Sequence, residues 1–587
     1  MFAVLEYGMD LSHGQVNAAF DGRPWNISTG NLSVSFIQAS PIGAFPKPNY
    51  LEAPPSVESL VRLKNLGLVA DEDYVAWGAV EREPGKWDWQ QHDAVEHNLH
   101  AAGMKYVAYI WAHFPPAWLK EKRTLMRCLE HNKETSYLSI FDPQTIEWYD
   151  HFYRNLHDHF GDRIDNVYAC ILGPYGEGNY PLEVKSWVNM GHCHEGYWCG
   201  DDYAIRAFQT AMQKKYSRIS RLNAAWGTHF KSFAEVRPLA EISENFKPSP
   251  AAFPTAQDKR RWLDFIGWYH QAIIDFAEKS LQTVLKYFPA EKVRMKPGGN
   301  AGGVNPVSWG TYCPGYAKMA GKYGVVLQPA DCQGAVFGDK WVGTAYQYYG
   351  VKECTEPAGD LDEHAFVRRM FSDASCGARQ LFSYQFEQHC TNIQKYVHLF
   401  TGEPGETGVA VYCPTTLYRL GASLQPTISA GWPLRDLCEF DVLDELLIRD
   451  GALNTRRYQA LLIFQGDIVE QDILDKIAAF RRAGGKMIVF GDAPIKNVEG
   501  KLWRETPKLV HLSTVAKNGK WLKELSIELG GIRGVDGKLD GLWTCRRSRQ
   551  MFVFNSKGKP VETIVDGESI TIEPYAIWMN EAAARKN

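Results

Sequence analysis

Apolar and polar positions alternate along residues 30–400 in a pattern that predicts strands separated by helices. Short apolar runs such as Val167–Leu172 are typical of strands buried on both faces of a parallel sheet. Segments with helical periodicity, for example Gln144–Phe160 and Trp262–Tyr287, lie between these runs. This alternation predicts an α/β fold in which residues 1–405 form a (β/α)8 barrel, the TIM barrel. Its eight strands are expected at Ser33–Gln38, Tyr74–Val80, Lys105–Trp111, Val167–Leu172, Val293–Lys296, Gly324–Gln328, Tyr346–Glu356 and Gln380–Gln385.

A different arrangement is expected after residue 405. The amphipathic segment Val469–Ala483 predicts a helix that ends at Gly484 and Gly485. Together with the flanking strand-like runs, this helix predicts a small doubly wound α/β domain over residues 406–530. Its first turn has no GxGxxG motif, so a nucleotide is not the expected ligand. Short alternating strands predict a small all-β domain over residues 531–587.

Composition excludes several functional classes. The net charge of −4 and the sequence pI near 6.5 provide no basic field for nucleic acid. No run approaches the length of apolar sequence that a membrane span needs. The N-terminal residues contain no basic segment ahead of an apolar one, so we expect no signal peptide and a cytoplasmic protein. Aromatic residues make up 13% of the chain, an excess that stacking on sugars or a large core would explain.

Cysteine usage indicates reduced thiols. The chain has 12 Cys, scattered and in part within apolar strand-like runs such as the one that contains Cys170. One group offers the residue types of a zinc site but lacks paired CxxC spacing. We therefore expect ordinary loop residues there, and no metal or other cofactor. The group consists of Cys128, His192, Cys193, His194 and Cys199.

The segment Ile171–Pro181 carries the strongest chemical signal. It reads ILGPYGEGNYP and places one carboxylate, Glu177, directly after a buried strand that glycines and a proline bring to an end. Tyr175 and Tyr180 flank the acid with flat rings of the kind that line sugar sites. Catalytic groups of (β/α)8 barrels lie at the C-terminal ends of the strands, so Glu177 is a candidate catalytic acid.

Most glycosidases need a second carboxylate, and the seventh predicted strand offers two. Glu353 and Glu356 point to opposite faces because side chains alternate along a strand, so only one can face the barrel mouth. Glu356 stands next to Pro357, where the strand must end, and is favoured because catalytic groups gather at strand termini. Glu353 is the alternative, and otherwise a supporting or ion-paired residue.

Further candidates for sugar contacts are polar or aromatic residues close to the predicted strand ends. For Glu83 a surface pair with Arg82 is an equal alternative, and for His113 so is a structural histidine. The candidate substrate-binding residues are Glu83, Trp111, His113, Tyr175, Asn179, Asn300, Trp309, Gln328 and Gln385.

Three motifs resemble glycoside hydrolase family 42, β-galactosidases built from a barrel, a doubly wound trimerisation domain and a small β domain. They are Trp77–Trp89 (WGAVEREPGKWDW), Pro115–Leu119 (PPAWL) and Leu222–Phe230 (LNAAWGTHF), of which the last is the most specific. The resemblance implies a retaining, exo-acting, β-galactosidase-like enzyme on oligosaccharides, with Glu177 as acid/base and Glu356 as nucleophile. It also implies a homo-oligomer, a trimer, assembled through the second domain.

The loop around Glu177 departs from that family. Gly176 precedes the acid where family 42 has an Asn, and Asn179 comes two residues after the acid. The segment GPYGEGNYP is instead similar to the GPxGExRYP segment of the β-amylases, glycoside hydrolase family 14, which invert configuration. An inverting α-glucan hydrolase is therefore one alternative function, and a non-catalytic sugar-binding protein on the same fold is another.

Overall fold

The computed structural model describes most of the 587 residues of the chain. Two of the predicted sugar contacts, Asn300 and Gln385, lie outside the described residues. The described residues are 2–6, 35–40, 54–182, 191–239, 242–243, 246–298, 305–331, 336–357, 361–383, 386–400, 403–504, 510–515, 519–535, 541–548, 550–565 and 568–579.

Parallel strands close into a barrel in the first two thirds of the chain, which confirms the predicted TIM barrel. Their hydrogen-bonded neighbours run in the order β2, β3, β4, β7, β8, β9, β11, β12 and back to β2, each pair parallel. β1 (Phe2–Glu6) adds antiparallel pairs to β2 and β12. The strands of the ring are β2 (Ser35–Ser40), β3 (Ala70–Ala76), β4 (Lys105–Trp111), β7 (Asn166–Tyr168), β8 (Val293–Met295), β9 (Val326–Leu327), β11 (Lys352–Pro357) and β12 (Gln380–Ser383).

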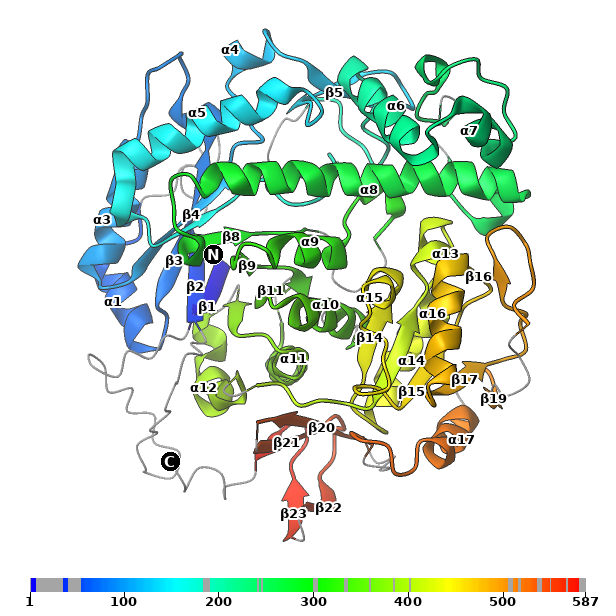
Figure 1. Ribbon diagram of the computed structural model, residues 1–587. Helices are drawn as coiled ribbons and strands as arrows, with labels where there is room; N and C mark the ends of the chain where they lie inside the picture. Colours follow the sequence, from blue (N-terminus) through cyan, green and yellow to red (C-terminus); the bar gives the residue numbers. More distant parts are fainter. Residues whose placement is uncertain are drawn as a thin grey trace.

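Helices surround the barrel, and the long helix α8 (Ala256–Val284) runs across most of the width of the molecule in Figure 1. It begins at a capping box in which Thr255 and Asp258 exchange hydrogen bonds. Among the described residues no helix, α8 included, is long and apolar enough to cross a bilayer. The other helices include α1 (Val57–Asn65), α3 (Gln90–Ala101), α5 (Pro143–Phe160), α6 (Asp202–Tyr216), α7 (Ile219–Trp226), α9 (Cys313–Ala320), α10 (Val336–Tyr349), α11 (Glu363–Cys376) and α12 (Phe386–Tyr396).

Two of the predicted strands include residues that form helices. The strand predicted at Tyr74–Val80 ends at Ala76, and its second half forms the short helix α2 (Trp77–Val80). The strand predicted to start at Tyr346 starts at Lys352, because α10 continues to Tyr349. Both errors come from Trp, Tyr and Val, whose preference for strands depends on context and gives way when they pack as part of a helix.

A second parallel sheet follows the barrel, at the lower right of Figure 1. Its strand order, β14-β13-β15-β17-β19, is that of a doubly wound sheet. Helix α16 (Gln471–Arg482) buries Ile473, Ile477 and Phe480, and the chain then turns at Gly484, with φ +101°, as predicted. The strands are β13 (Val409–Cys413), β14 (Asp441–Asp444), β15 (Ala460–Ile463), β17 (Lys486–Phe490) and β19 (Val510–Leu512).

The C-terminal part is built from short antiparallel strands, as predicted, and lies at the bottom of Figure 1. β20 (Leu542–Arg547), which the sequence analysis did not predict, pairs with β21 (Gln550–Asn555), and β21 pairs with β24 (Ile577–Met579). β22 (Val561–Val565) and β23 (Glu568–Ile572) form a separate hairpin. In the barrel, a further small hairpin joins β5 (Leu125–Arg127) to β6 (Glu134–Leu138).

Candidate active site

Glu177 lies in a tight loop that follows β7. Backbone hydrogen bonds close this loop: the N–H of Ile171 donates to the carbonyl of Gly176 at 2.8 Å, and the N–H of Leu172 donates to the carbonyl of Glu177 at 3.0 Å. Gly176 has φ +74°, and a Cβ there would lie 3.1 Å from the carbonyl oxygen of Ile110. The glycines that predicted a turn are therefore needed for the backbone path that presents Glu177.

The segment after β8 holds the other side of this loop. The N–H of Gly178 donates to the carbonyl of Lys296 at 3.0 Å, and a Cβ on Gly178 would lie 2.4 Å from the carbonyl oxygen of Pro297. Gly298, with φ +73°, approaches the acid itself: a Cβ there would lie 2.7 Å from Cβ and 3.1 Å from Oε2 of Glu177. Backbone contacts that only glycine allows thus fix the position of Glu177.

Glu356 lies at the end of β11 and is held by a buried lysine. Nζ of Lys296 lies 2.8 Å from Oε2 of Glu356, and Nε2 of Gln328 donates to the same oxygen at 3.3 Å. Lys296 is only 3% exposed, so its charge needs a counterion inside the protein. Burial alone would lower the pKa of Lys296, but the charges of Glu356 and Glu72 outweigh it and raise this pKa. Lys296 is therefore a fixed positive charge beside Glu356.

A third carboxylate lies deeper in the barrel. Glu72, on β3, is fully buried, and its Oε2 lies 4.0 Å from Nζ of Lys296. The hydroxyl of Tyr168 donates to its Oε1 and also contacts Gln328. Burial raises the pKa of Glu72, and Lys296 opposes this effect. One cation therefore faces two carboxylates, and Glu356 is the closer of them.

Glu177 has the environment of a proton donor. Burial of its carboxyl group, and then the charge of Glu356, raise the pKa of Glu177 to about 7, while Lys296 lowers it only in part. Part of the residue nevertheless remains open to the surface. Near neutral pH one carboxyl group of the pair thus keeps its proton for much of the time, whereas Lys296 stabilises the other as an anion. Two-carboxylate hydrolysis requires this division of charge.

Aromatic side chains line the barrel interior beside the carboxylates. The Tyr109 hydroxyl donates to the carbonyl of Tyr175, and Nζ of Lys296 lies 4.1 Å from the centre of the Tyr109 ring. Trp111 is fully buried and stacks on Tyr74, with ring centres 5.0 Å apart. Tyr175 is half-buried, and burial followed by the charges of Glu177 and Glu356 raises the pKa of its hydroxyl. Tyr175 therefore lies at the carboxylates, with Trp111 behind it at 6.3 Å between ring centres.

Two of the predicted sugar contacts, His113 and Asn179, are buried and make hydrogen bonds within the loop that carries Glu177. His113 is 2% exposed, with Nδ1 3.4 Å from Sγ of Cys170 and Nε2 3.3 Å from the carbonyl oxygen of Pro174. Burial lowers the pKa of His113 to about 3, so the ring is neutral, as in the alternative of a structural histidine. Asn179 is also 2% exposed and donates through Nδ2 to the carbonyl of Tyr180 at 3.1 Å. The contacts of both side chains therefore stabilise the backbone of this loop.

No interaction among the described residues brings Glu83 or Trp309, two further predicted sugar contacts, to the carboxylates. Glu83 is exposed and forms an ion pair across a turn with Lys86, so its partner is neither a substrate-facing group nor Arg82. Trp309 is half-buried in the 3-10 helix η6 (Val307–Trp309), and its carbonyl accepts the N–H of Tyr180 at 2.8 Å. Its place is next to the loop that follows β7.

The choice between Glu353 and Glu356 follows the alternation of the strand. Glu353 is 4% exposed, and after burial its charge contributes to raising the pKa of Cys313 on α9 to about 12. It also raises the pKa of Tyr346 on α10 in the same way. Glu353 therefore faces the helices outside the barrel, while Glu356 faces Lys296 and Gln328 inside it.

The sequence analysis overlooked Lys296 and Glu72, although both carried a signal. Arg294 and Lys296 stand two residues apart, so a strand buried on both faces carries two cations on one side. β3 reads ADEDYVA, and all seven of its residues are buried. Charged side chains in such strands must find partners inside the barrel. A charged side chain within a strand that is predicted to be buried is therefore the signal that could have identified Lys296 and Glu72.

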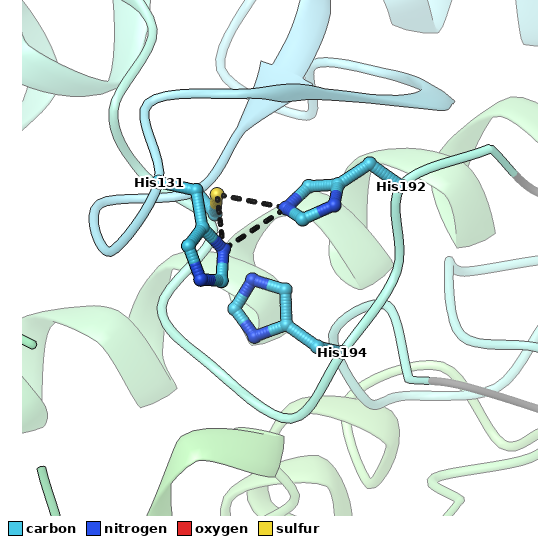
Figure 2. Close-up of side chains that lie close together, drawn as sticks. His131, His192 and His194 are labelled. Carbon is cyan, nitrogen blue, oxygen red and sulfur yellow. Dashed lines mark hydrogen bonds between the residues drawn. The ribbon is translucent and has the colours of Figure 1, made fainter. Parts of the chain in front are cut away.

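A second group of reactive side chains lies in two loops and is called here the Cys–His cluster (Figure 2). It comprises Cys128, His131, His192 and His194, whose ligand atoms all lie within 4.8 Å of one another. Burial alone would raise the pKa of the Cys128 thiol, but the neighbouring His194 imidazole and backbone N–H groups lower it to about 5. Three of these side chains, Cys128, His192 and His194, belong to the group that the sequence predicts to be ordinary loop residues, and His131 was not part of that group. Cys193 of the same group lies apart from the other three, with its Sγ 3.1 Å from Oγ1 of Thr135.

Comparisons with known proteins bear out both resemblances at the level of sequence. The model of glycosyl hydrolase family 14 matches residues 130–324, which include Glu177 and Lys296. A β/α-amylase of Paenibacillus polymyxa is 28% identical over 277 residues, 43% of this chain and 22% of that protein. A β-galactosidase of an Arthrobacter species is 26% identical over 242 residues, 38% of this chain and 31% of that protein. The chain thus matches less than a third of the length of either relative.

Solved structures share the fold over nearly the whole chain. The β-galactosidase of the Antarctic haloarchaeon Halorubrum lacusprofundi aligns with a TM-score of 0.65 at 13% sequence identity, covering 92% of this chain and 98% of that one. The β-galactosidase of Rahnella sp. R3 aligns with a TM-score of 0.65 at 12% identity, covering 94% and 98%. The chain therefore resembles β-galactosidases in its whole architecture, and the family 14 enzymes in the sequence of the barrel segment that carries Glu177.

Proposed function

We propose that the chain is a glycoside hydrolase of oligosaccharides in which Glu177 and Glu356 are the two catalytic carboxyl groups. The observation that carries the proposal is their unequal environment: the pKa of Glu177 is raised to about 7, while Nζ of Lys296 lies 2.8 Å from Glu356. Glycoside hydrolysis needs one protonated and one ionised carboxyl group across the scissile bond. Placing two carboxyl groups together in a barrel costs stability, which favours an enzyme over a sugar-binding scaffold.

We further propose retention of the anomeric configuration, in an exo-acting, β-galactosidase-like reaction. Glu177 gives its proton to the glycosidic oxygen as this oxygen leaves C1, and the carboxylate of Glu356 forms an ester bond to C1. Water then attacks C1 and passes a proton to Glu177, while the bond between C1 and Glu356 breaks. Lys296 and Gln328 hold the Glu356 oxygen, and the Tyr175 ring offers a wall for the sugar. The family 42 motifs and the fold of the solved β-galactosidases support this proposal.

An inverting α-glucan hydrolase is the second candidate, favoured by the family 14 match around Glu177. In that mechanism Glu356 acts as a base on a water molecule that attacks C1 directly. The two carboxyl groups then need to be roughly 6.5–9.5 Å apart, against roughly 5–5.5 Å for a retaining enzyme. Both candidates use Glu177 and Glu356, and they differ in the anomeric configuration of the product.

Product stereochemistry separates the candidates. Proton NMR of the first-formed sugar, from aryl β-galactosides and from maltooligosaccharides, should show a retained anomer from the β-galactoside. A 2-fluoro glycoside should then label the protein, and peptide mapping should find the label on Glu356. Inverted product without an adduct would replace the first proposal with the second. Sugar binding without turnover on every substrate would instead support the non-catalytic alternative.

We also propose that the chain forms a homotrimer through the second domain, residues 406–530. The resemblance to family 42 supports this, and so do two large apolar side chains exposed in this region, Leu502 at 52% and Ile527 at 80%. Light scattering should give three times the chain mass of 66.4 kDa. An Ile527→Glu variant should dissociate more readily, and a monomer of the unmodified chain at micromolar concentration would overturn the proposal.

A further inference from the structure

The backbone that carries Glu356 is held by hydrogen bonds on both sides. The N–H of Glu356 donates to the carbonyl of Pro329 at 3.1 Å, and the carbonyl of Thr355 accepts a hydrogen bond from Nη2 of Arg369 at 3.0 Å. Both polar groups of the peptide unit between Thr355 and Glu356 are therefore fixed. Because the direction of a strand side chain follows from its backbone, these two bonds help to set where the Glu356 carboxyl group points.

Thr355 joins this strand end to helix α11. Side chains alternate along β11, so Thr355 points towards the helices outside the barrel while Glu356 points into it. The hydroxyl of Thr355 donates to Oδ2 of Asp373 at 2.7 Å, and Nη2 of Arg369 donates to the same hydroxyl oxygen at 3.3 Å. Both the carbonyl and the hydroxyl of Thr355 are thus attached to side chains of α11.

Arg369 and Asp373 form a buried ion pair on α11. They are 4% and 1% exposed, and Nε of Arg369 lies 3.3 Å from Oδ2 of Asp373, one helical turn away. Apolar side chains of similar volume often stabilise a protein as well as such a pair does, so stability alone does not explain it. What the pair adds is direction, because its charged groups make hydrogen bonds to Thr355 on the strand that carries Glu356.

The C-terminal end of α11 is itself held by buried cations. The carbonyl of Ala374 accepts a hydrogen bond from Nη1 of Arg547 on the C-terminal strand β20, and the carbonyl of Ser375 accepts one from Nζ of Lys340 at 2.9 Å. The last carbonyls of a helix have no partner within the helix, and a positive charge is favoured there. Helix α11 therefore offers the ion pair a fixed support, to which the C-terminal β strands contribute.

We propose that Thr355, Arg369 and Asp373 are positioning residues that direct the carboxyl group of Glu356 towards Lys296 and towards C1 of the substrate. All three act through the backbone of Glu356 from outside the barrel. The proposal rests on the proposed function but on neither of its two stereochemical forms, because Glu356 acts at C1 in both. A displacement of the reacting group by about 1 Å can lower the rate about 10²-fold, so loss of the Thr355 hydroxyl should affect kcat more than KM.

Three threonine variants of the full chain test the proposal. Thr355→Val removes the hydroxyl, and it should lower kcat on an aryl glycoside about 10- to 10²-fold while KM stays within about twofold. Thr355→Ser keeps the hydroxyl and loses a methyl group, and its kcat should stay within about threefold of that of the unmodified chain. Thr427→Val is the matched control. Thr427, on α14 (Gln425–Arg435) of the second domain, is fully buried and donates its hydroxyl to Oε1 of Gln465 at 2.9 Å.

The control separates positioning from stability. Each Val variant removes one buried hydrogen bond, so both should lower the midpoint of urea unfolding by similar amounts, but only Thr355→Val should lose kcat. Equal kcat values in the two Val variants would overturn the proposal, and so would a loss in Thr355→Ser as large as that in Thr355→Val.

Two further outcomes can be told apart. If Thr355→Val does not fold, Thr355→Ala takes its place with the same expected loss of kcat, because Ala and Ser differ only by the hydroxyl oxygen. An unmodified chain that hydrolyses no glycoside would overturn the proposed function, and with it any role of Thr355 in turnover. An active unmodified chain with an equally active Thr355→Ala would overturn the positioning role alone.

Discussion

The segment that follows β7 contributes Glu177 to the carboxylate site in the barrel and His192 and His194 to the Cys–His cluster, but these two groups are assembled differently. Lys296, Gln328 and Glu356 stand at the ends of the barrel strands β8, β9 and β11, and Glu177 lies in the loop after β7; backbone pairing makes these strands neighbours. The cluster lies between two loops that, in the described part of the chain, are joined by an isolated bridge from Thr135 to Gly191, by backbone hydrogen bonds, and by side-chain contacts such as that of Thr135 with Cys193. One group therefore depends on the sheet, and the other on how two loops approach each other.

The two regions also use charge in different ways. In the barrel, the acidic side chains Glu177 and Glu356 lie close enough to affect each other's ionisation. Lys296, which pairs with Glu356, gives the two carboxyl groups different electrostatic environments. In the cluster, one thiol and three imidazoles have their sulfur and nitrogen atoms within 4.8 Å of one another, and no carboxyl group is among them. The activity of the barrel site should therefore decrease strongly when the charge of Lys296 is lost, or when a methyl group is added at Gly298. The cluster should mainly affect how firmly the loops are held.

The largest effect is expected from Glu177→Gln. This variant cannot protonate a departing sugar, so kcat on a poor leaving group should fall about 10²–10⁴-fold. An activated dinitrophenyl glycoside needs little protonation and should lose much less, which makes it the internal control. Steady-state kinetics on both substrates would measure the difference. Equal losses on the two substrates would show that Glu177 is not the proton donor, and the two carboxyl groups would then have no separate roles.

Lys296→Met should be the next most damaging change. It leaves the carboxylates of Glu356 and Glu72 without their cation, and breaking a buried ion pair on one side costs about 3–5 kcal/mol of the free energy of unfolding. Lys322→Met is the matched control, because Lys322 is 58% exposed and pairs with Glu278 at 3.0 Å. That pair should contribute about 0–1 kcal/mol. Urea unfolding followed by tryptophan fluorescence would compare them, and similar midpoints would contradict a buried charge pair.

Gly298→Ala should impair catalysis without removing any charge. Its Cβ would lie 2.7 Å from Cβ of Glu177 and 2.7 Å from Oδ1 of Asn179, so the side chain of Glu177 would have to move. A displacement of the acid by about 1 Å can lower kcat about 10²-fold. Gly324→Ala has the same φ of +73° with nothing within 4 Å of the added Cβ, so it reports backbone strain alone. Equal losses of activity would show that strain, and not contact with Glu177, matters.

The pH profile gives a smaller but specific effect. Glu177 must be protonated to act as an acid, and its pKa is raised to about 7, so kcat/KM should fall with increasing pH above 7. The decrease should approach about tenfold per pH unit, because only the protonated fraction is active. The limb should be clear on a poor leaving group and weak on an activated glycoside, and Glu177→Gln should lack it. If the limb persists in that variant, another group, and not Glu177, controls it.

The sequence could predict the parts of the site that barrel topology determines. Glu177 and Glu356 follow from strand ends, and the opposite orientation of Glu353 follows from the alternation of side chains. Lys296 was missed although it is the last residue of a predicted strand, because its importance depends on which carboxylate stands across the barrel. His131 and His192 could not be paired from the sequence, since the approach of two loops 61 residues apart is set by tertiary packing.

A change in the Cys–His cluster should have the smallest effect on turnover, and this prediction rests on the proposed function. Among the described residues, packing connects the region of the cluster to the acid loop: Tyr137 on β6 stacks on His113 at 5.7 Å, and His113 lies 3.3 Å from the carbonyl oxygen of Pro174. Cys128→Ser should therefore lower kcat only a few-fold and lower the midpoint of thermal unfolding by a few degrees. Cys193→Ser is the matched control, because its Sγ lies 3.1 Å from Oγ1 of Thr135. A loss of kcat as large as that of Glu177→Gln would mean that the two regions act as one functional unit.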